Sequence, residues 1–127
     1  KGDKMSANYD LTSGLDEGFE FKATLKGKLH EYNVAYPSQK DLQPIQMGYS
    51  RIQEIDKEFA KLGEDEKDKK DKLIKETEKI AKEMNEAFNS LFTPKGDSMP
   101  VSDLIEQLPL PARKKWEEMI KNEFSIE

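Results

Sequence analysis

The sequence predicts an α+β fold, in which an N-terminal two-stranded antiparallel β-hairpin packs on a mainly helical body of about four helices. Two observations predict this fold. Residues 19–36, "FEFKATLKGKLHEYNVAY", alternate apolar and polar side chains as a half-buried hairpin does. After residue 41, large apolar residues recur at spacings of three and four, which is typical of amphipathic helices. The chain therefore divides into an arm, residues 1–18, and a single hairpin-plus-helices domain, residues 19–127.

The register of the hairpin follows from a two-residue loop at Gly27 and Lys28. Facing residues then share one side of the sheet, and the apolar residues of both strands collect together. The apolar side holds Phe19, Phe21, Ala23, Leu25, His30, Tyr32, Val34 and Tyr36, with Leu25 opposite His30 and Phe21 opposite Val34. Glycine at the first loop position suits a type II′ turn, which needs a positive φ there. Two strands alone are marginal in water, so the helices that follow or a partner must cover the apolar side.

The arm, "KGDKMSANYDLTSGLDEG", carries few apolar side chains and several turn-forming residues. We therefore expect it to be flexible or bound to a partner. The chain begins at Lys1 and its first methionine is Met5. Tag residues, proteolytic processing and trimming are all compatible with this start.

Two long helices are predicted to follow the hairpin and to pack as an antiparallel pair. The first begins after Asp41, preferred to Ser38 as the N-cap because it leaves Pro44 in the first turn, and runs to about Leu62. Its apolar stripe, Leu42, Ile45, Tyr49, Ile52, Ile55, Phe59 and Leu62, is weakened at Gly48. A charged break, "GEDEKDKKDK", covers residues 63–72. The second stripe, Leu73, Thr77, Ile80, Met84, Phe88 and Leu91, ends before "TPKGDSMP".

Two shorter helices are predicted in the C-terminal segment. The segment begins at Val101, where Ser102 can cap a short helix that runs through Leu108 and that the sequence "LPLP" stops. Pro111 then occupies the first turn of the final helix. One face of that helix carries Ala112, Trp116, Met119, Ile120 and Phe124.

Composition and charge argue for a binding protein and against an enzyme. The chain has no cysteine, one histidine and a formal net charge of −5, and its lysines are interleaved with acids, so we expect no nucleic-acid binding. The sequence contains no run of about 18 apolar residues, so it predicts no membrane span. His30 is better interpreted as a structural histidine than as a catalytic or metal-binding one. The acidic run of residues 64–71 lacks the glycine and closing glutamate of a calcium loop. We expect no catalytic residues, no metal and no cofactor.

Two stretches resemble a known family. The first, "FEFKATLKGKLHEYNVAYPSQKDLQPI", places a hairpin with a Gly-Lys turn before a proline and an Asp-Leu pair that opens a helix. The second, "SDLIEQLPLPARKKWEEMI", is an apolar helix broken at Leu-Pro and followed by another. Together they are similar to the tail assembly chaperones of long-tailed bacteriophages, over Phe19 to Ile120.

The resemblance implies a non-enzymatic role. A protein of this family binds the hydrophobic tape-measure protein and helps recruit tail-tube subunits in the host cytoplasm during phage assembly, often as a homo-oligomer. The alternative is a structural subunit that stays in a virion or another large assembly. Six apolar residues are the candidate partner-binding set, with core packing as the alternative role for the final helix: Tyr32, Tyr36, Trp116, Met119, Ile120 and Phe124.

Overall fold

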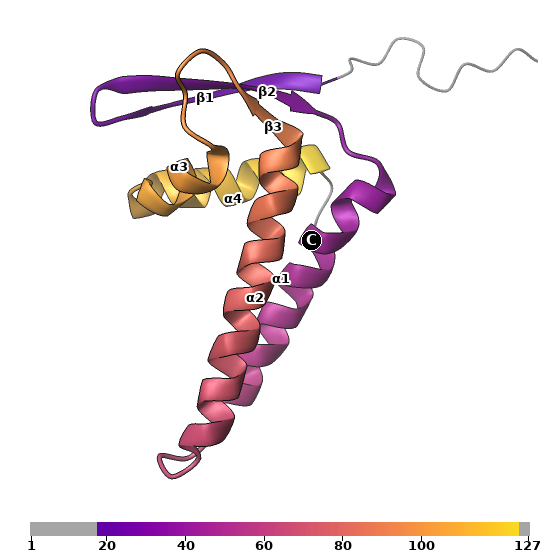
Figure 1. Cartoon of the computed structure of the whole chain (residues 1–127), viewed down its shortest axis with the longest axis vertical. Helices are drawn as coiled ribbons and strands as arrows, with labels where there is room; N and C mark the ends of the chain where they lie inside the picture. The colour runs from indigo at the N-terminus through magenta and orange to yellow at the C-terminus, as the bar shows by residue number, and fades with distance from the viewer. Residues whose placement is uncertain (1–17, 125–127) are drawn as a thin grey trace, which may run out of the picture.

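A computed structural model describes residues 18–124 and confirms the α+β fold. The predicted arm, residues 1–18, lies outside the described residues apart from Gly18. The elements are β1 (Gly18–Leu25), β2 (Lys28–Ala35), α1 (Gln39–Ala60), α2 (Lys67–Leu91), β3 (Phe92–Pro94), α3 (Val101–Gln107) and α4 (Leu110–Phe124). The sheet and the two short helices gather at one end, and the α1–α2 pair extends away from them as a long helical hairpin (Figure 1).

The predicted hairpin forms, but its turn is one residue earlier than expected. Lys26 and Gly27 are the loop residues, with φ of 51° and 80°, so that Leu25 pairs with Lys28 and Phe21 with Tyr32. The predicted Gly27-Lys28 loop, its type II′ turn and its pairings are therefore wrong. Two positive φ values are what a type I′ turn requires, and its twist matches that of the strands. Because the register moves by two residues, each side chain keeps its predicted side of the sheet.

A third strand was not predicted. β3 follows α2 directly and pairs with β2 in antiparallel register, Tyr32 with Pro94 and Val34 with Phe92, which gives the sheet order β1-β2-β3. The Phe92 side chain is fully buried. The strand escapes sequence analysis because three residues are too few to show an alternating pattern.

The first long helix begins earlier than predicted. Ser38, not Asp41, is the N-cap: its side chain accepts a hydrogen bond from the Asp41 backbone N–H, and the Asp41 carboxylate accepts one from the Ser38 N–H. This capping box satisfies two backbone donors at once. Pro44 therefore lies inside the helix, beyond its first turn. The helix ends at Ala60, two residues before the predicted Leu62.

The charged break between the long helices is shorter than predicted. α2 begins at Lys67, so the second half of the break is helical. Lysines and acids spaced three and four apart suit an exposed helix, and Lys69 pairs with Glu66 at 3.5 Å. Gly48 marks a close approach of the two helices, since a Cβ there would overlap the Met84 side chain. The residue that weakens the apolar stripe is therefore a contact point.

The short helices form as predicted, except that Ser102 does not cap α3. Pro100 holds the N-cap position. The Ser102 backbone N–H donates to Asn89 Oδ1 at 3.0 Å, and the Asn89 amide donates to the Ser102 hydroxyl at 2.9 Å. A side chain of α2 therefore supplies the hydrogen-bond acceptor for a backbone N–H group in the first turn of α3. This contact depends on how the two helices pack, so the local sequence does not predict it. Pro111 lies in the first turn of α4, as expected.

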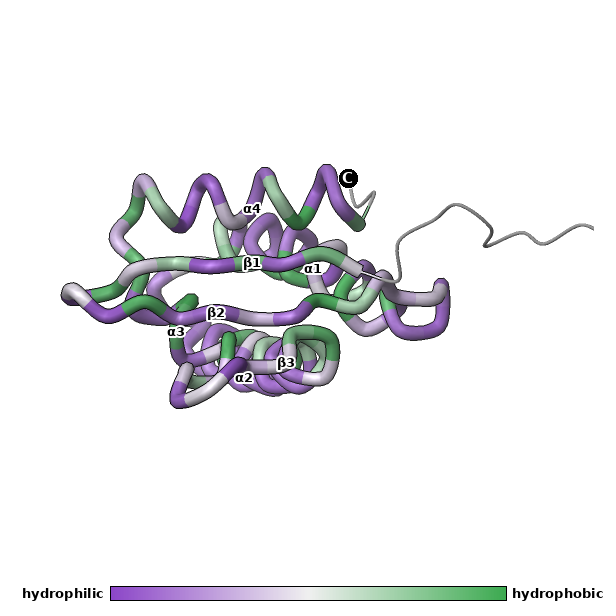
Figure 2. The backbone as a smooth tube through the Cα atoms, turned by 90° about the horizontal axis from the view of Figure 1, so that it is seen from above, coloured by the Kyte–Doolittle hydropathy of each residue, from purple (hydrophilic) through white to green (hydrophobic). Residues whose placement is uncertain are grey.

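The core lies between the apolar side of the sheet and the helices. A cluster of aromatic rings fills it, with ring centroids 5.2 to 6.4 Å apart: Phe19, Phe21, Tyr32, Phe88, Phe92, Trp116 and Phe124. Such ring pairs add stabilisation beyond the area that they bury. From above, α4 runs beside β1 (Figure 2).

Candidate functional site

The single histidine is part of the core packing near the hairpin turn. His30 is 2% exposed, and its Nδ1 accepts a hydrogen bond from the Met99 backbone N–H at 3.2 Å. This bond ties β2 to the loop before α3. Within residues 18–124, no group of three or more metal-ligating side chains is arranged to hold a metal ion. No helix in that range is long and apolar enough to span a membrane.

The six residues of the candidate partner-binding set lie in two kinds of environment. Tyr32, Trp116, Ile120 and Phe124 are core residues with at most 4% of their surface exposed. Their side chains are therefore used mainly in the packing of the folded chain. Met119 is half-buried, and Tyr36 is 45% exposed with its hydroxyl donating to Glu123 at 3.5 Å.

Tyr32 combines full burial with an unsatisfied hydroxyl. The ring packs against Phe21 and Phe92, and the hydroxyl has no hydrogen-bond partner among the described residues. Burial, followed by the negative charge of Asp103, raises the pKa of Tyr32 to about 12. Because the folded chain favours the protonated phenol, this residue contributes to stability rather than to proton transfer near neutral pH.

An accessible hollow runs along the α1–α2 pair. This helix-pair groove has a volume of about 630 Å³ and an apolar floor formed by Pro44, Met47, Gly48 and Ile80. Its rim carries charges of both signs: Lys40, Arg51, Glu76, Lys79 and Glu83. Met47 is 62% exposed, which is unusual for a large apolar side chain. The groove therefore presents an apolar strip between mixed charges.

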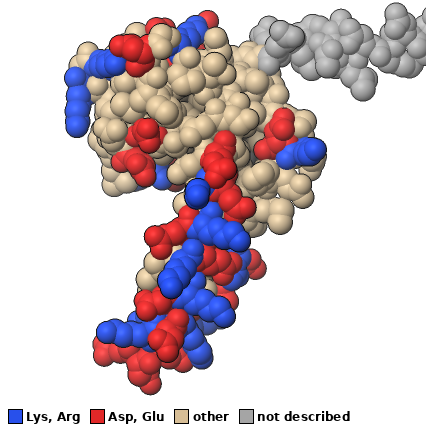
Figure 3. Space-filling view, in the orientation of Figure 1, with Lys and Arg blue, Asp and Glu red and all other residues tan. Residues whose placement is uncertain are grey.

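The charges along the helix pair set it apart from the rest of the molecule. On the face shown in Figure 3, Lys, Arg, Asp and Glu side chains crowd the helix pair, while the end with the sheet is largely uncharged. Positive and negative side chains alternate at short range. Such a surface keeps a protruding helix pair in solution without creating a field of one sign.

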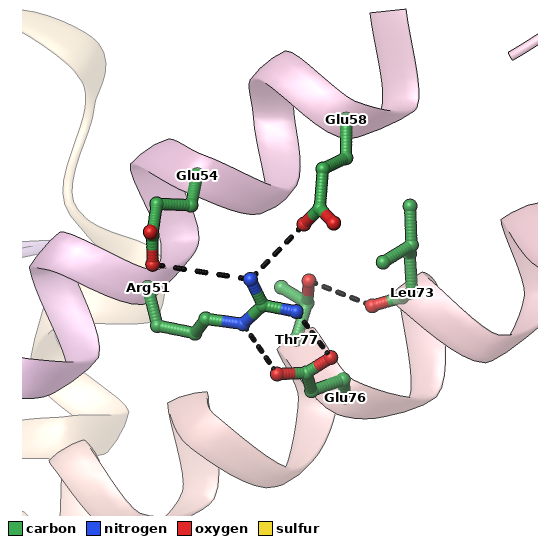
Figure 4. Close-up of polar contacts among 6 residues, drawn as sticks. All are labelled: Arg51, Glu54, Glu58, Leu73, Glu76 and Thr77. Atoms are coloured by element: carbon green, nitrogen blue, oxygen red, sulfur yellow. Dashed lines mark hydrogen bonds and ion pairs between the residues drawn. The ribbon is translucent and has the colours of Figure 1, made fainter. Parts of the chain in front are cut away.

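Arg51 fixes the two long helices to each other beside the groove (Figure 4). Its Nε and Nη2 donate to the two carboxylate oxygens of Glu76 on α2, at 2.6 and 2.9 Å, and its Nη1 donates to Glu58 at 3.0 Å. Glu54 approaches the same nitrogen at 3.8 Å. The hydrogen bond from Arg51 is the main cause that lowers the pKa of Glu76. A bidentate pair of this kind sets orientation as well as attraction.

A second apolar exposure lies farther along the helix pair. Phe59 and Ile74 are 37% and 46% exposed, and both line a shallow hollow with Ile55 and Leu73. Lys70 places its ammonium 5.5 Å from the centre of the Phe59 ring. The helix pair therefore exposes apolar side chains at more than one place along its length.

The helix-pair groove was not predicted from the sequence. Met47 lies outside the apolar stripe and gave no signal as a lone apolar residue on a polar face. Arg51 did have a signal, since Glu54 and Glu58 follow it at spacings of three and seven on one side of a helix. Its main partner, Glu76, lies across a turn whose geometry the sequence does not specify.

The comparisons with known proteins do not place the chain in a family. No protein-family profile, no curated protein and no solved structure matches it.

Proposed function

We propose that the protein is a non-enzymatic assembly chaperone of the kind found in long-tailed bacteriophages. In this role it binds the hydrophobic tape-measure protein and helps recruit tail-tube subunits in the host cytoplasm, with self-association as a further possibility. The observation that carries the proposal is the protruding α1–α2 pair, whose groove exposes apolar side chains between mixed charges. The likeness of residues 19–120 to that family, stated above, supplies the identity of the partners.

An exposed apolar groove can bind a partner because covering its apolar side chains is favourable. Covering a large aliphatic side chain contributes about 1.5–3 kcal/mol. An amphipathic helix laid in such a groove covers several side chains at once, and the charged rim then selects its register. The long helical tape-measure protein offers segments of this kind. Because only a strip of apolar surface is exposed, the contact can form and dissociate during assembly.

The proposal is tested by co-expressing the chain with the tape-measure protein encoded in the same genome. The native chain should keep that protein in the soluble fraction and co-purify with it. Met47→Glu should greatly reduce both, because it places a charge on the floor of the helix-pair groove. Leu110→Glu is the matched control: Leu110 is 68% exposed at the start of α4, away from the groove, so its variant should behave as the native chain does.

A resident structural subunit is the second candidate, since a protruding helix pair also suits a permanent contact between subunits. Mass spectrometry of purified particles separates the two roles. A chaperone should be absent from mature particles or present only in traces. An amount of the chain comparable to that of the tail proteins would contradict the chaperone role and favour the subunit.

A further inference from the structure

The outer edge of β1 and the neighbouring α4 form a second apolar groove, at the end of the molecule that holds the sheet. The β1–α4 groove has a volume of about 320 Å³ and is lined by Phe21 and Ala23 of β1 and by Leu108, Ala112, Trp116 and Met119. Lys22 and Lys115 stand at its rim. Figure 2 shows α4 lying beside β1, and no strand formed by residues 18–124 lies on the outer side of β1.

β1 is an edge strand that no other described residue extends. In the order β1-β2-β3, only its inner side is paired. Counting from the Leu25–Lys28 pair that closes the loop, the backbone groups of Glu20, Lys22 and Thr24 point away from β2. An edge of this kind accepts a further strand, and natural proteins usually cover it.

The segment that precedes β1 has the pattern of such a strand. Residues 7–12, "ANYDLT", alternate apolar side chains with polar ones. The apolar members are Ala7, Tyr9 and Leu11. Residues 6–17 carry three acids and no base, whereas both charged residues at the rim of the groove are lysines. The segment therefore complements the groove in charge as well as in pattern.

We propose that residues 7–12 of this chain pair antiparallel with the outer edge of β1 and cover the β1–α4 groove. Leu11 lies opposite Phe21 and Tyr9 opposite Ala23, so that both apolar side chains enter the groove. In this register Asp10 faces Lys22 across the strands. A shift of two residues that sets Asp10 against Glu20 would replace this attraction with repulsion.

The connection fits the chain length. With Gly14 opposite Gly18, residues 15–17 form a three-residue loop flanked by two glycines, a common hairpin connection. Because the segment is joined directly to β1, its effective concentration at the groove exceeds that of any separate chain. The occupant is therefore this chain's own arm, and the inference stands apart from the chaperone role.

Amide hydrogen exchange measured by NMR on the full chain tests the proposal. The Lys22 and Thr24 amides should be protected, and nuclear Overhauser contacts should join the Leu11 and Met119 methyl groups. Leu11→Asp should lower the protection by about tenfold or more, because it places a charge in an apolar groove. It should also shift the fluorescence of Trp116, the only tryptophan. Asn8→Asp, which adds the same charge on the polar side of the segment, should change neither reading.

Two results would overturn the proposal. One is an unprotected Lys22 amide in the native chain together with unchanged readings in Leu11→Asp. The other is protection that appears only at high concentration, alongside a dimer in light scattering, since the arm of a second copy would then be the occupant. Far-UV circular dichroism of both variants confirms that the helices remain folded.

Discussion

The buried hydroxyl of Tyr32 gives the sharpest test of the core. The side chain has 0% exposure, and its hydroxyl lacks a hydrogen-bond partner in the described part of the chain. An unsatisfied buried polar group costs about 1–3 kcal/mol. Tyr32→Phe deletes that group while keeping the ring, so we expect the free energy of unfolding to rise by about 1 kcal/mol. Tyr32→Asp should instead lower it by a few kcal/mol, because it buries an unpaired charge among aromatic rings.

The same residue predicts loss of stability in alkali. Burial raises the pKa of Tyr32 from 10.0 to about 12 in the folded chain. The folded state therefore holds the phenol proton more tightly than the unfolded state does. This contribution is fully present below pH 10 and is lost as the pH rises from 10 to 12, at a cost of about 3 kcal/mol in total.

Urea unfolding of the native chain and Tyr32→Phe, at pH 7 and at several values between 10 and 12, measures both effects. Native stability should fall more steeply with alkali than that of the variant, so the gap between them should widen. The raised pKa of the partly buried Tyr49 acts equally in both proteins and cancels in the difference. Tyr36→Phe, at an exposed tyrosine, is the control. If Tyr32→Phe were less stable than the native chain at pH 7, the hydroxyl would have a partner and the reasoning would fail.

Three further substitutions test the helical part. Arg51→Gln should lower the melting temperature and weaken its dependence on salt, because the bidentate contact to Glu76 is lost; an unchanged salt dependence would contradict this. Gly48→Ala should cost about 1–3 kcal/mol in urea unfolding, since its methyl group meets the Met84 side chain, and a gain in stability would mean that this side chain moves freely. Asn89→Ala should cost about 1–2 kcal/mol by removing both hydrogen bonds to the start of α3, and equal melting curves would show that water replaces them.

The sequence predicts features that follow from a local pattern of residues better than features that depend on detailed backbone geometry. The faces of the hairpin follow from an alternation of period two, and any shift of the register by two residues preserves them. The turn itself does not follow, because Lys26 adopts a positive φ that its residue type disfavours. Type I′ and type II′ turns both match the twist of the strands, so a single glycine does not decide between a Lys26-Gly27 loop and a Gly27-Lys28 loop.

Two contacts between different helices were not predicted from the sequence. Asn89 satisfies the start of α3 from α2, and Arg51 joins α1 to α2 through Glu76. Both contacts depend on how the helices are placed, which local pattern does not determine. The candidate partner-binding set was chosen by size and hydrophobicity, and four of its six members are in the core because those properties also select core residues. Exposed Met47 was overlooked because a single apolar residue shows no period.

The two proposals place their binding surfaces on different elements, α1 and α2 in one case and β1 and α4 in the other, and this makes them separable. If the arm covers the β1–α4 groove, the helix-pair groove is still open to a partner. Leu11→Asp should then uncover β1 without reducing the solubilisation of the tape-measure protein, while Met47→Glu should abolish solubilisation and leave the Lys22 amide protected. Loss of solubilisation in Leu11→Asp would instead show that the partner uses the edge of the sheet. In that case the helix pair would be a spacer rather than the binding site.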